Sequence, residues 1–431
     1  MLYDNVSMTD GRLYFAGRDV VALAEKYGTP LYIMDEEKIR EKCRAYRVAL
    51  DNCVCPESLA VYASKACSFG AIYKIIAEEG LGADVVSAGE IYTAYKAGFD
   101  MSRAYFQGNN KTDWDINFAI DCGVGYFVCD NLEELEALDR IAGERGIKQK
   151  ILLRVTPGID PHTYDEVATG KVDSKFGVAI ETGQALEAAK VALSKPNLEL
   201  LGFHCHVGSM VFDSDVFYRA SAVMLGFIKD VKTATGFEAS ILDLGGGYGV
   251  KYYDGQGELD IAENIKGVAE YVAKTANELG VAVPSLRLEP GRSIVADAGI
   301  TVYTVGSVKK ITGYKNYVSV DGGMTDNPRY ALYESKYTVL CANKQSDETI
   351  TADLVGRCCE SGDIIQPECR FPADIGRGDL VAVLTTGAYN YSMASNYNRI
   401  ARPAVVMLSK DSDRLVVKRE TLDDLIQNDI L

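Results

Sequence analysis

Lys65 occupies a position that suits covalent chemistry. It follows the apolar run 59–64, which is typical of a buried strand, and apolar side chains at helical spacing return in segment 71–80. A lysine at such a strand-to-helix corner can be shielded from water, which lowers its pKa and makes its amine a nucleophile toward carbonyl carbon. The alternative is a surface lysine that closes a strand.

A run of three glycines follows another apolar segment. Gly245, Gly246 and Gly247 come directly after Leu242-Asp243-Leu244. Their backbone amides can bind an anion such as a phosphate, or the run can simply form a tight turn. The spacing matches neither a Walker loop nor a dinucleotide-binding unit, so no nucleotide is implied.

Two histidines and a glutamate add further polar groups. His204 and His206 lie two residues apart, and we expect them on one face of a strand. As metal ligands they need a third partner, and the remaining histidine is His162 in a loop-like stretch. Stacking on an aromatic ligand suits one ring equally well, and a core hydrogen bond suits the other. Glu289 can pair with a protonated ring nitrogen or with Arg292.

An amine, an anion-binding turn, an imidazole and a carboxylate together suit one cofactor. Pyridoxal 5′-phosphate (PLP) can use the lysine for its aldehyde and backbone amides for its phosphate. The carboxylate would keep the pyridine nitrogen protonated, so that the ring can accept electrons. The sequence therefore predicts a PLP site wherever the fold brings these residues together.

The elements that must position these residues recur with a regular rhythm. Eight short apolar runs alternate with segments that are mostly helix-patterned, and they cover 59–64, 82–86, 104–106, 126–129, 151–155, 200–206, 241–244 and 285–289. Such strands pair in parallel, and eight units in roughly 240 residues match a (β/α)₈ TIM-type barrel. An open doubly wound sheet is the alternative. In a barrel the active site lies at the C-terminal strand ends, where Lys65, Asp84, Arg154, the two histidines and Glu289 would converge.

The rhythm changes after about residue 298. Strand-like runs without clear helices predict a C-terminal antiparallel β domain. An N-terminal hairpin around Asp10-Gly11 has no core of its own, so we expect it to complete that domain. The predicted division is an N-terminal segment 1–30, a PLP-binding barrel 31–298 and a C-terminal β domain 299–431.

Composition limits the partners and the compartment. A net charge of -16 argues against nucleic acid and anionic membranes as partners, because both require clustered cations. No apolar run of about 18 residues and no export signal is evident, so a cytoplasmic location is expected. The 11 cysteines are odd in number and lack zinc-ribbon spacing, which indicates reduced thiols and no metal site.

Six segments spread over nearly the whole chain form a recognisable set. They are Tyr62-Ala63-Ser64-Lys65-Ala66, Asp173-Ser174-Lys175-Phe176-Gly177, His204-Cys205-His206-Val207-Gly208-Ser209, Gly245-Gly246-Gly247, Glu289-Pro290-Gly291-Arg292 and Cys359-Glu360-Ser361-Gly362-Asp363. In this order they resemble the diaminopimelate decarboxylase family, within the alanine racemase-like fold group of PLP enzymes. Two departures stand out, since Cys67-Ser68 replaces an Asn-containing pair of many relatives and Cys358 doubles the usual single cysteine.

The resemblance implies a role for each matching residue. Lys65 would hold the cofactor as a Schiff base, His206 would stack on its ring and Glu289 would pair with its pyridine nitrogen. The phosphate would be surrounded by Ser209, Gly245, Gly246, Gly247, Pro290, Gly291, Arg292 and Tyr389. The substrate's distal end would be bound by Arg292, Arg329, Tyr333, Glu360 and Tyr389. Asp84 and Arg154 join the cofactor-binding set through their predicted place at the strand ends.

The implied reaction is the loss of CO₂ from meso-2,6-diaminopimelate to give L-lysine, the last step of lysine biosynthesis. Cys359 and Glu360 resemble a pair donated by a neighbouring subunit, which implies a homodimer with Cys359 near the reacting carbon. Planar arginines suit a substrate with a far carboxylate. The alternatives are a decarboxylase of ornithine, lysine or arginine on the same fold, a non-catalytic PLP carrier and a metal-dependent barrel hydrolase.

Overall fold

The eight predicted parallel strands are all present in the computed structural model, which describes residues 3–159 and 173–430. They are β5 (Leu59–Ala63), β6 (Gly82–Val85), β7 (Ala104–Phe106), β8 (Tyr126–Cys129), β9 (Gln149–Thr156), β11 (Leu198–His204), β12 (Ile241–Asp243) and β13 (Ser285–Leu288). Every neighbouring pair is parallel, and β13 pairs with β5 through Arg287 and Leu59. The sheet therefore closes on itself, which confirms the barrel and excludes an open sheet.

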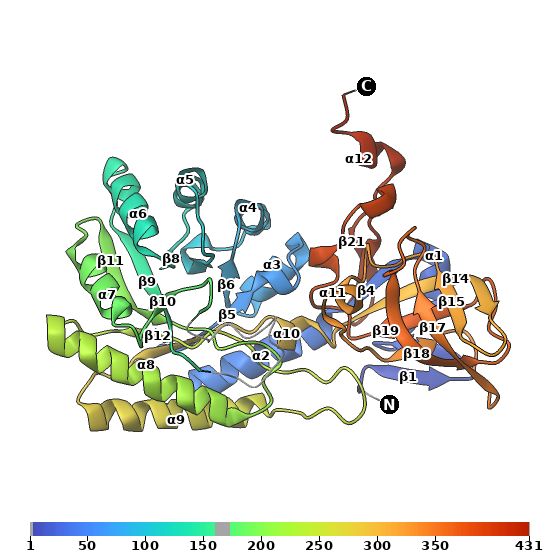
Figure 1. The fold of residues 1–431 in the computed structure, drawn as a ribbon, viewed down its shortest axis with the longest axis horizontal. Helices are drawn as coiled ribbons and strands as arrows, with labels where there is room; N and C mark the ends of the chain where they lie inside the picture. Colours follow the sequence, from blue (N-terminus) through green and yellow to red (C-terminus); the bar gives the residue numbers. More distant parts are fainter. Residues whose placement is uncertain (1–2, 160–172, 431) are drawn as a thin grey trace. The chain divides into compact units, whose positions relative to one another are not determined.

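Helices follow most barrel strands and lie outside them (Figure 1). Helix α2 (Glu36–Asp51) precedes β5, and the helices that follow barrel strands include α3 (Gly70–Glu78), α4 (Ala88–Lys96), α5 (Asp113–Asp121), α6 (Leu132–Glu144), α7 (Gln184–Ser194), α8 (Ser214–Thr235) and α9 (Ile261–Leu279). Their ends are encoded locally: the Asn131 side chain caps α6 by accepting the Glu134 N–H, and Gly236 ends α8 in a left-handed conformation. Many of the predicted site residues lie in the segments that lead from a strand end to the next helix, and the segment after β12, residues 244–260, is a long one.

The chain divides into two compact units. The barrel unit comprises residues 40–250 and 258–293, and the sheet unit comprises 1–39, 251–257 and 294–431. Segments 31–39, 251–257 and 294–298, which the sequence-based division places in the barrel, thus belong to the sheet unit. In the part of the chain that the structure describes, no helix has the length and apolar character needed to cross a bilayer.

The sheet unit is built around one large sheet. Its strands are β4 (Leu31–Asp35), β14 (Gly299–Lys310), β15 (Asn316–Val320), β16 (Val339–Cys341), β17 (Thr349–Val355), β18 (Ile364–Pro372), β19 (Leu380–Leu384), β20 (Ala404–Leu408) and β21 (Asp413–Val417). Most pairs are antiparallel, as predicted, but β15 pairs in parallel with β17 and β4 pairs in parallel with β20. Both parallel pairs join strands that are distant along the chain, so no tight hairpin turn fixes their direction.

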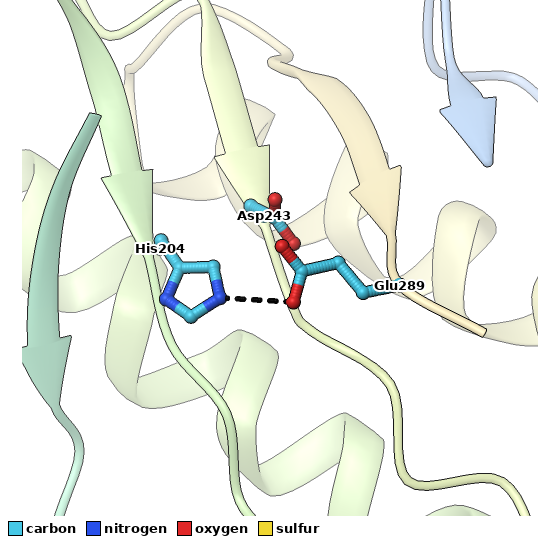
Figure 2. A group of neighbouring side chains, drawn as sticks. All are labelled: His204, Asp243 and Glu289. Atoms are coloured by element: carbon cyan, nitrogen blue, oxygen red, sulfur yellow. Dashed lines mark hydrogen bonds and ion pairs between the residues drawn. The ribbon is translucent and has the colours of Figure 1, made fainter. Parts of the chain in front are cut away.

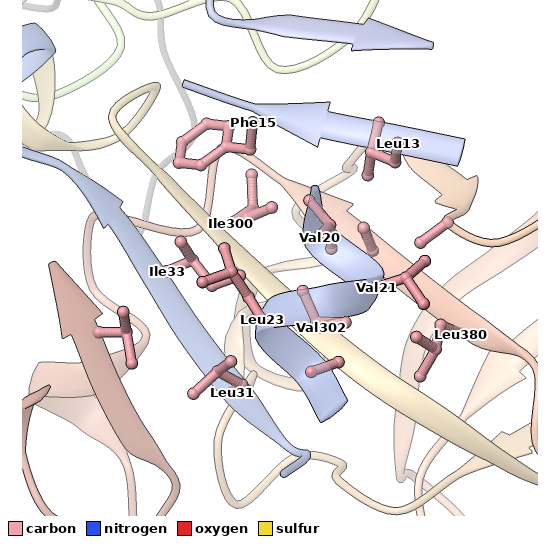
Figure 3. Close-up of a cluster of buried hydrophobic side chains, with 14 of the residues drawn as sticks. Leu13, Phe15, Val20, Val21, Leu23, Leu31, Ile33, Ile300, Val302 and Leu380 are labelled. Atoms are coloured by element: carbon pink, nitrogen blue, oxygen red, sulfur yellow. The ribbon is translucent and has the colours of Figure 1, made fainter. Parts of the chain in front are cut away.

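The N-terminal segment completes the core of this unit. Strands β1 (Val6–Thr9), β2 (Arg12–Phe15) and β3 (Arg18–Asp19) form a small sheet of their own, followed by α1 (Val20–Tyr27). Leu13 and Phe15 pack in one buried cluster with Leu31, Ile300 and Leu380 (Figure 3). The hairpin contributes to the β domain mainly through side chains, because β1–β3 form a separate sheet. One backbone hydrogen bond adds to this packing: the Leu13 N–H donates to the Ala342 carbonyl oxygen over 2.9 Å.

Candidate active site

Lys65 lies in a turn directly after β5. The strand ends at Ala63, and Ser64–Ala66 forms a 3₁₀ turn. The buried Ser64 hydroxyl donates to Glu90 Oε2 over 2.6 Å, and the same oxygen accepts the Val86 N–H over 2.8 Å. Lys65 itself is exposed, which corrects the expectation of a desolvated amine: the residue sits on the turn rather than in the strand. Its position at the C-terminal end of β5 is as predicted.

Glu289 is held at both carboxylate oxygens. It follows β13, and the Gln107 amide donates to its Oε1. The His204 ring nitrogen Nε2 lies 3.2 Å from its Oε2 (Figure 2). Glu289, Gln107 and His204 are 7%, 4% and 1% exposed, so this carboxylate has a fixed direction in a dry environment. Two donors on one buried carboxylate favour its ionised form.

Two further carboxyl groups, Asp84 and Asp243, are buried nearby. Burial and the negative charge of Glu289 raise the pKa of both well above the ordinary value. Burial also acts on Glu289 in the same direction, but the His204 ring and Lys65 outweigh it and lower its pKa. Burial lowers the pKa of His204, whose neutral ring then donates its Nε2–H. The site therefore concentrates its negative charge on Glu289.

His206 lies beyond the end of β11 and contacts the glycine run. The Gly246 N–H donates to His206 Nδ1 over 3.3 Å, which leaves the ring proton on Nε2. Burial and the charges of Lys65 and Arg154 lower the pKa of His206 well below its ordinary value, so the ring is neutral. The expectation that His204 and His206 share one face of a strand is wrong, because β11 ends at His204.

The glycine run is required by close backbone packing. A Cβ atom on Gly246 would lie 2.1 Å from the Glu289 carbonyl oxygen, and one on Gly247 would lie 2.2 Å from the Gly208 carbonyl oxygen. Gly245 has a φ of +69°, and a Cβ there would lie 2.7 Å from His206 Nδ1. Only glycine lets the turn after β12 approach the turns after β11 and β13 this closely.

The segment after Glu289 packs against the end of β5. The Ala63 N–H donates to the Pro290 carbonyl oxygen over 3.0 Å, and a Cβ on Gly291 would lie 2.9 Å from the Ala63 carbonyl oxygen. Arg292 Nη2 donates to Ser209 Oγ over 3.0 Å. These contacts bring two of the predicted phosphate-binding segments together beside the turn that carries Lys65.

Arg154 connects the barrel to the motif Asp173–Gly177. Its Nε lies 3.9 Å from Asp130 Oδ1, which also accepts the Gly177 N–H over 3.0 Å. Its guanidinium carbon lies 4.4 Å from the centre of the Phe176 ring. Burial lowers the pKa of Arg154. The residue thus supplies a buried positive charge whose direction is fixed from two sides.

The remaining predicted residues belong to the sheet unit. Arg329 begins the short helix α11 (Arg329–Tyr333), and its guanidinium carbon lies 5.7 Å from the centre of the Tyr389 ring. Tyr333 at the other end of α11 is 40% exposed. Cys359 and Glu360 lie on an exposed turn between β17 and β18.

Sequence reasoning missed Gln107 and Asp243. Gln107 directly follows β7, the same strand-end position that pointed to the other site residues. Asp243 precedes the glycine run, and its Oδ1 accepts the Gly245 N–H over 2.9 Å, an aspartate turn that sequence alone can suggest. His204, Asp243 and Glu289 also place one ligand atom each within 4.8 Å of one another, a spacing that a metal ion could exploit. His162, considered as a third metal ligand, lies outside the described residues.

The chemistry of the set fits PLP more completely than it fits a metal. A metal would use the His204, Asp243 and Glu289 side chains and would leave Lys65 without a role. PLP uses an amine, an ionised carboxylate for the ring nitrogen, a neutral imidazole for the ring and backbone amides for the phosphate. Asp84 Oδ1 and Gln107 Oε1 are buried without a hydrogen-bond partner among the described residues, which is consistent with polar groups that face a ligand.

Known relatives decide between these possibilities. Residues 36–296 match the family described as "Pyridoxal-dependent decarboxylase, pyridoxal binding domain". A diaminopimelate decarboxylase of Bacillus subtilis (strain 168) is 43% identical over 421 residues, which is 97% of this chain and 95% of that protein. The chain belongs to the diaminopimelate decarboxylase family.

Solved structures agree with this membership. A crystal structure of diaminopimelate decarboxylase from M. jannaschii in co-complex with L-lysine has a TM-score of 0.91 and 35% identity, and covers 99% of this chain and 98% of its own. A lysine/ornithine decarboxylase from Vibrio vulnificus complexed with cadaverine has a TM-score of 0.76 and 26% identity, over 91% and 98% of the two chains. As a member of the diaminopimelate decarboxylase family, the chain is a PLP-dependent amino-acid decarboxylase. The hydrolase and carrier alternatives receive no such support.

Proposed function

We propose that this enzyme removes CO₂ from meso-2,6-diaminopimelate and releases L-lysine, using the site residues described above. The observation that carries the choice of substrate is Arg329. It is 6% exposed, and Nη1 donates to the hydroxyls of Tyr252 over 3.1 Å and Tyr337 over 3.3 Å. Among the described residues no carboxylate forms an ion pair with it. A buried guanidinium held by hydroxyl groups is well suited to bind a substrate carboxylate bidentately.

The barrel residues would hold the cofactor and tune it. Lys65 would bond to its aldehyde, Glu289 would pair with the ring nitrogen, and His206 would lie against the ring. Ser209, Arg292 and the amides of the glycine run would bind its phosphate. Bound PLP supplies an electron sink for the electron pair left at Cα when CO₂ departs.

The protein's own contribution is orientation and charge. The Gln107 and His204 donors keep Glu289 ionised and aimed, so that positive charge on the ring nitrogen is stabilised where electrons arrive. Arg329 would bind the distal carboxylate and exclude substrates that end in a lone amine, because a buried cation facing a buried cation is unfavourable. Cys359 would hold the proton that is delivered to Cα.

The test of this function is lysine release from meso-diaminopimelate, measured with and without added PLP. Ornithine, lysine and arginine serve as competing substrates. We expect PLP-dependent lysine release and little turnover of the other three. Arg329→Lys, which keeps the charge but loses the planar fork, should raise KM for diaminopimelate far more than it lowers kcat. If diaminopimelate is not decarboxylated while one of the other amino acids is, the substrate assignment is wrong.

The covalent role of Lys65 has its own test. Borohydride reduction of the PLP-loaded enzyme followed by peptide mapping should place a pyridoxyl group on Lys65. The modified peptide is identified by its mass, so the other lysines of the chain need no separate assignment. A pyridoxyl group on a different lysine would refute the assignment.

We also propose that the enzyme is a homodimer in the cytoplasm, with Cys359 and Glu360 donated to the partner's active site. Their exposure on one turn and the free state of all 11 cysteines support this arrangement. Lys65→Ala and Cys359→Ala should each be inactive. Mixed after unfolding and refolding together, they should regain about a quarter of the wild-type activity, because half of the dimers then hold one intact site. No regain would place both residues in the same subunit's site.

A further inference from the structure

We propose that Asp363 is a positioning residue that couples the turn carrying Cys359 and Glu360 to the turn that leads into Arg329. This inference rests on the proposed function, which gives Arg329 the substrate's distal carboxylate and gives Cys359 and Glu360 to the partner's site. Asp363 would therefore link the two active sites of the dimer.

The Asp363 side chain joins two separate segments of the sheet unit. It is 4% exposed. Its Oδ1 accepts the Met324 N–H over 2.6 Å, and its Oδ2 accepts the Cys358 N–H over 2.7 Å. Both oxygens of one buried carboxylate are thus used to fix backbone, and each one fixes a different turn.

The two turns pack directly on this carboxylate. A Cβ atom on Gly323 would lie 2.6 Å from Asp363 Oδ1, and one on Gly356 would lie 2.3 Å from Asp363 Oδ2. The Arg357 N–H donates to the Gly322 carbonyl oxygen over 2.9 Å, which ties the turns to each other as well. Neither turn has room to shift without displacing the other.

On one side the restraint reaches Arg329 through a short, hydrogen-bonded segment. Asp326 Oδ2 accepts the Gly323 N–H over 3.0 Å, and the Asn327 N–H donates to the Gly323 carbonyl oxygen over 2.8 Å. Asp326 and Asn327 are 1% and 0% exposed. Helix α11 starts two residues later at Arg329, so a displacement at Met324 is carried to the guanidinium.

On the other side the restraint reaches Cys359 directly. The Cys358 amide bound by Asp363 precedes Cys359, whose own N–H donates to Asn398 Oδ1 over 2.7 Å. The Glu360 N–H donates to the Cys358 carbonyl oxygen over 2.8 Å. The buried Asp363 carboxylate therefore fixes the backbone of the turn that bears the exposed Cys359 thiol and Glu360 carboxylate.

The variant that tests this role is Asp363→Asn in the PLP-loaded enzyme. Asparagine keeps one carbonyl oxygen, so one of the two amides loses its acceptor while volume is unchanged. Asp347→Asn, on an exposed turn of the same unit, is the matched control. Three quantities are compared: kcat, KM for diaminopimelate, and the rate of alkylation of Cys359 by iodoacetamide, located by peptide mapping.

A coupling residue should change all three quantities at once. We expect Asp363→Asn to lower kcat about tenfold or more, the factor that one unsatisfied buried amide can produce, and to raise KM severalfold. Alkylation of Cys359 should also change severalfold, and the control should match the wild type in all three. A change in kcat and thiol reactivity with an unaltered KM, or a variant like the wild type, would overturn the proposal.

A second measurement uses the wild-type enzyme and applies even if the variant does not fold. Hydrogen exchange at the Met324 and Cys358 amides should be slow and similar, because both depend on one carboxylate. Pimelate, a dicarboxylate without amines, should slow exchange at both amides together when it binds. Unlinked exchange at the two amides would overturn the proposal. Failure of lysine release would instead refute the proposed function. The hydrogen-exchange experiment can be carried out and interpreted whether or not the enzyme releases lysine.

Discussion

Replacing Gly246 by alanine tests whether the glycine run is needed for packing. The added Cβ would lie 2.1 Å from the Glu289 carbonyl oxygen, whereas real Cβ atoms essentially never approach other heavy atoms closer than 3.0 Å. One of the two backbone segments must therefore move by at least the difference, about 1 Å. The obstructing atom is backbone and not the end of a flexible side chain, so the clash cannot be relieved by a change of rotamer.

Two effects follow from this movement. Overpacking of this kind typically costs about 1–3 kcal/mol of unfolding free energy. Displacement of Glu289 also pulls its carboxylate away from the Gln107 and His204 donors, and we expect PLP affinity to fall about tenfold or more, the equivalent of about 1.4 kcal/mol. The loss of lysine-forming activity should be larger still, because geometry in the reacting complex is less tolerant than binding.

Gly226→Ala is the matched control. Gly226 lies within α8, and nothing is within 4 Å of a Cβ built on it. Since alanine is the better helix former, this variant should be more stable than the wild type by up to about 1 kcal/mol and should bind PLP normally. Urea unfolding, a PLP titration by absorbance and the lysine-release assay compare the three proteins. If Gly246→Ala retains wild-type stability and PLP affinity, the close approach of these turns does not require glycine.

Three further substitutions test the electrostatics of the site and of the sheet unit. His204→Leu removes a donor from Glu289, so PLP should bind more weakly while the fold persists; unchanged affinity would show that Gln107 alone suffices. Lys65→Ala should lose turnover and should lose its bound cofactor on gel filtration, and retention of both would refute the covalent role. Burial raises the pKa of Asp326 from 3.8 to about 7, so the folded protein keeps a proton that the unfolded chain loses above pH 3.8. The stabilising contribution of this protonated carboxyl group is therefore complete below pH 3.8 and is lost as the pH rises toward 7. Asp326→Asn should therefore lose less stability than the wild type between these pH values in urea unfolding, and equal slopes would contradict the assignment.

The sequence predicted the barrel well because its signals are local. Each apolar run overlaps a strand, and β7 and β8 have the predicted bounds. The polar residues at the strand ends were found by the same rule. The resemblance to the diaminopimelate decarboxylase family rests on six motifs, five of which lie in the barrel unit, while 359–363 lies in the sheet unit.

The features that sequence reasoning missed depend on distant contacts or on unusual backbone. Strand β18 contains Pro367 and Pro372, and prolines inside a segment argue against a strand, so the sequence does not predict one here. The structure shows unusual backbone in the same strand, because Glu368 has a φ of +54°. Gln107 is a neutral residue without a motif, and only its contact with Glu289 reveals its role. The exposure of Lys65 depends on a single 3₁₀ turn, which apolar periodicity does not predict.

The position of β4 in the sheet has a consequence for how the protein folds while it is being synthesised on the ribosome. This strand is made early, yet its two neighbours in the sheet are β14 and β20, and Leu31 pairs with Ala404. The barrel can close as soon as β13 has emerged, whereas β4 keeps one edge without a neighbour until almost the entire polypeptide has been synthesised. Loss of the last thirty or so residues would remove β20 and leave that edge open for good, so C-terminal truncation should yield aggregates even though every barrel residue is present.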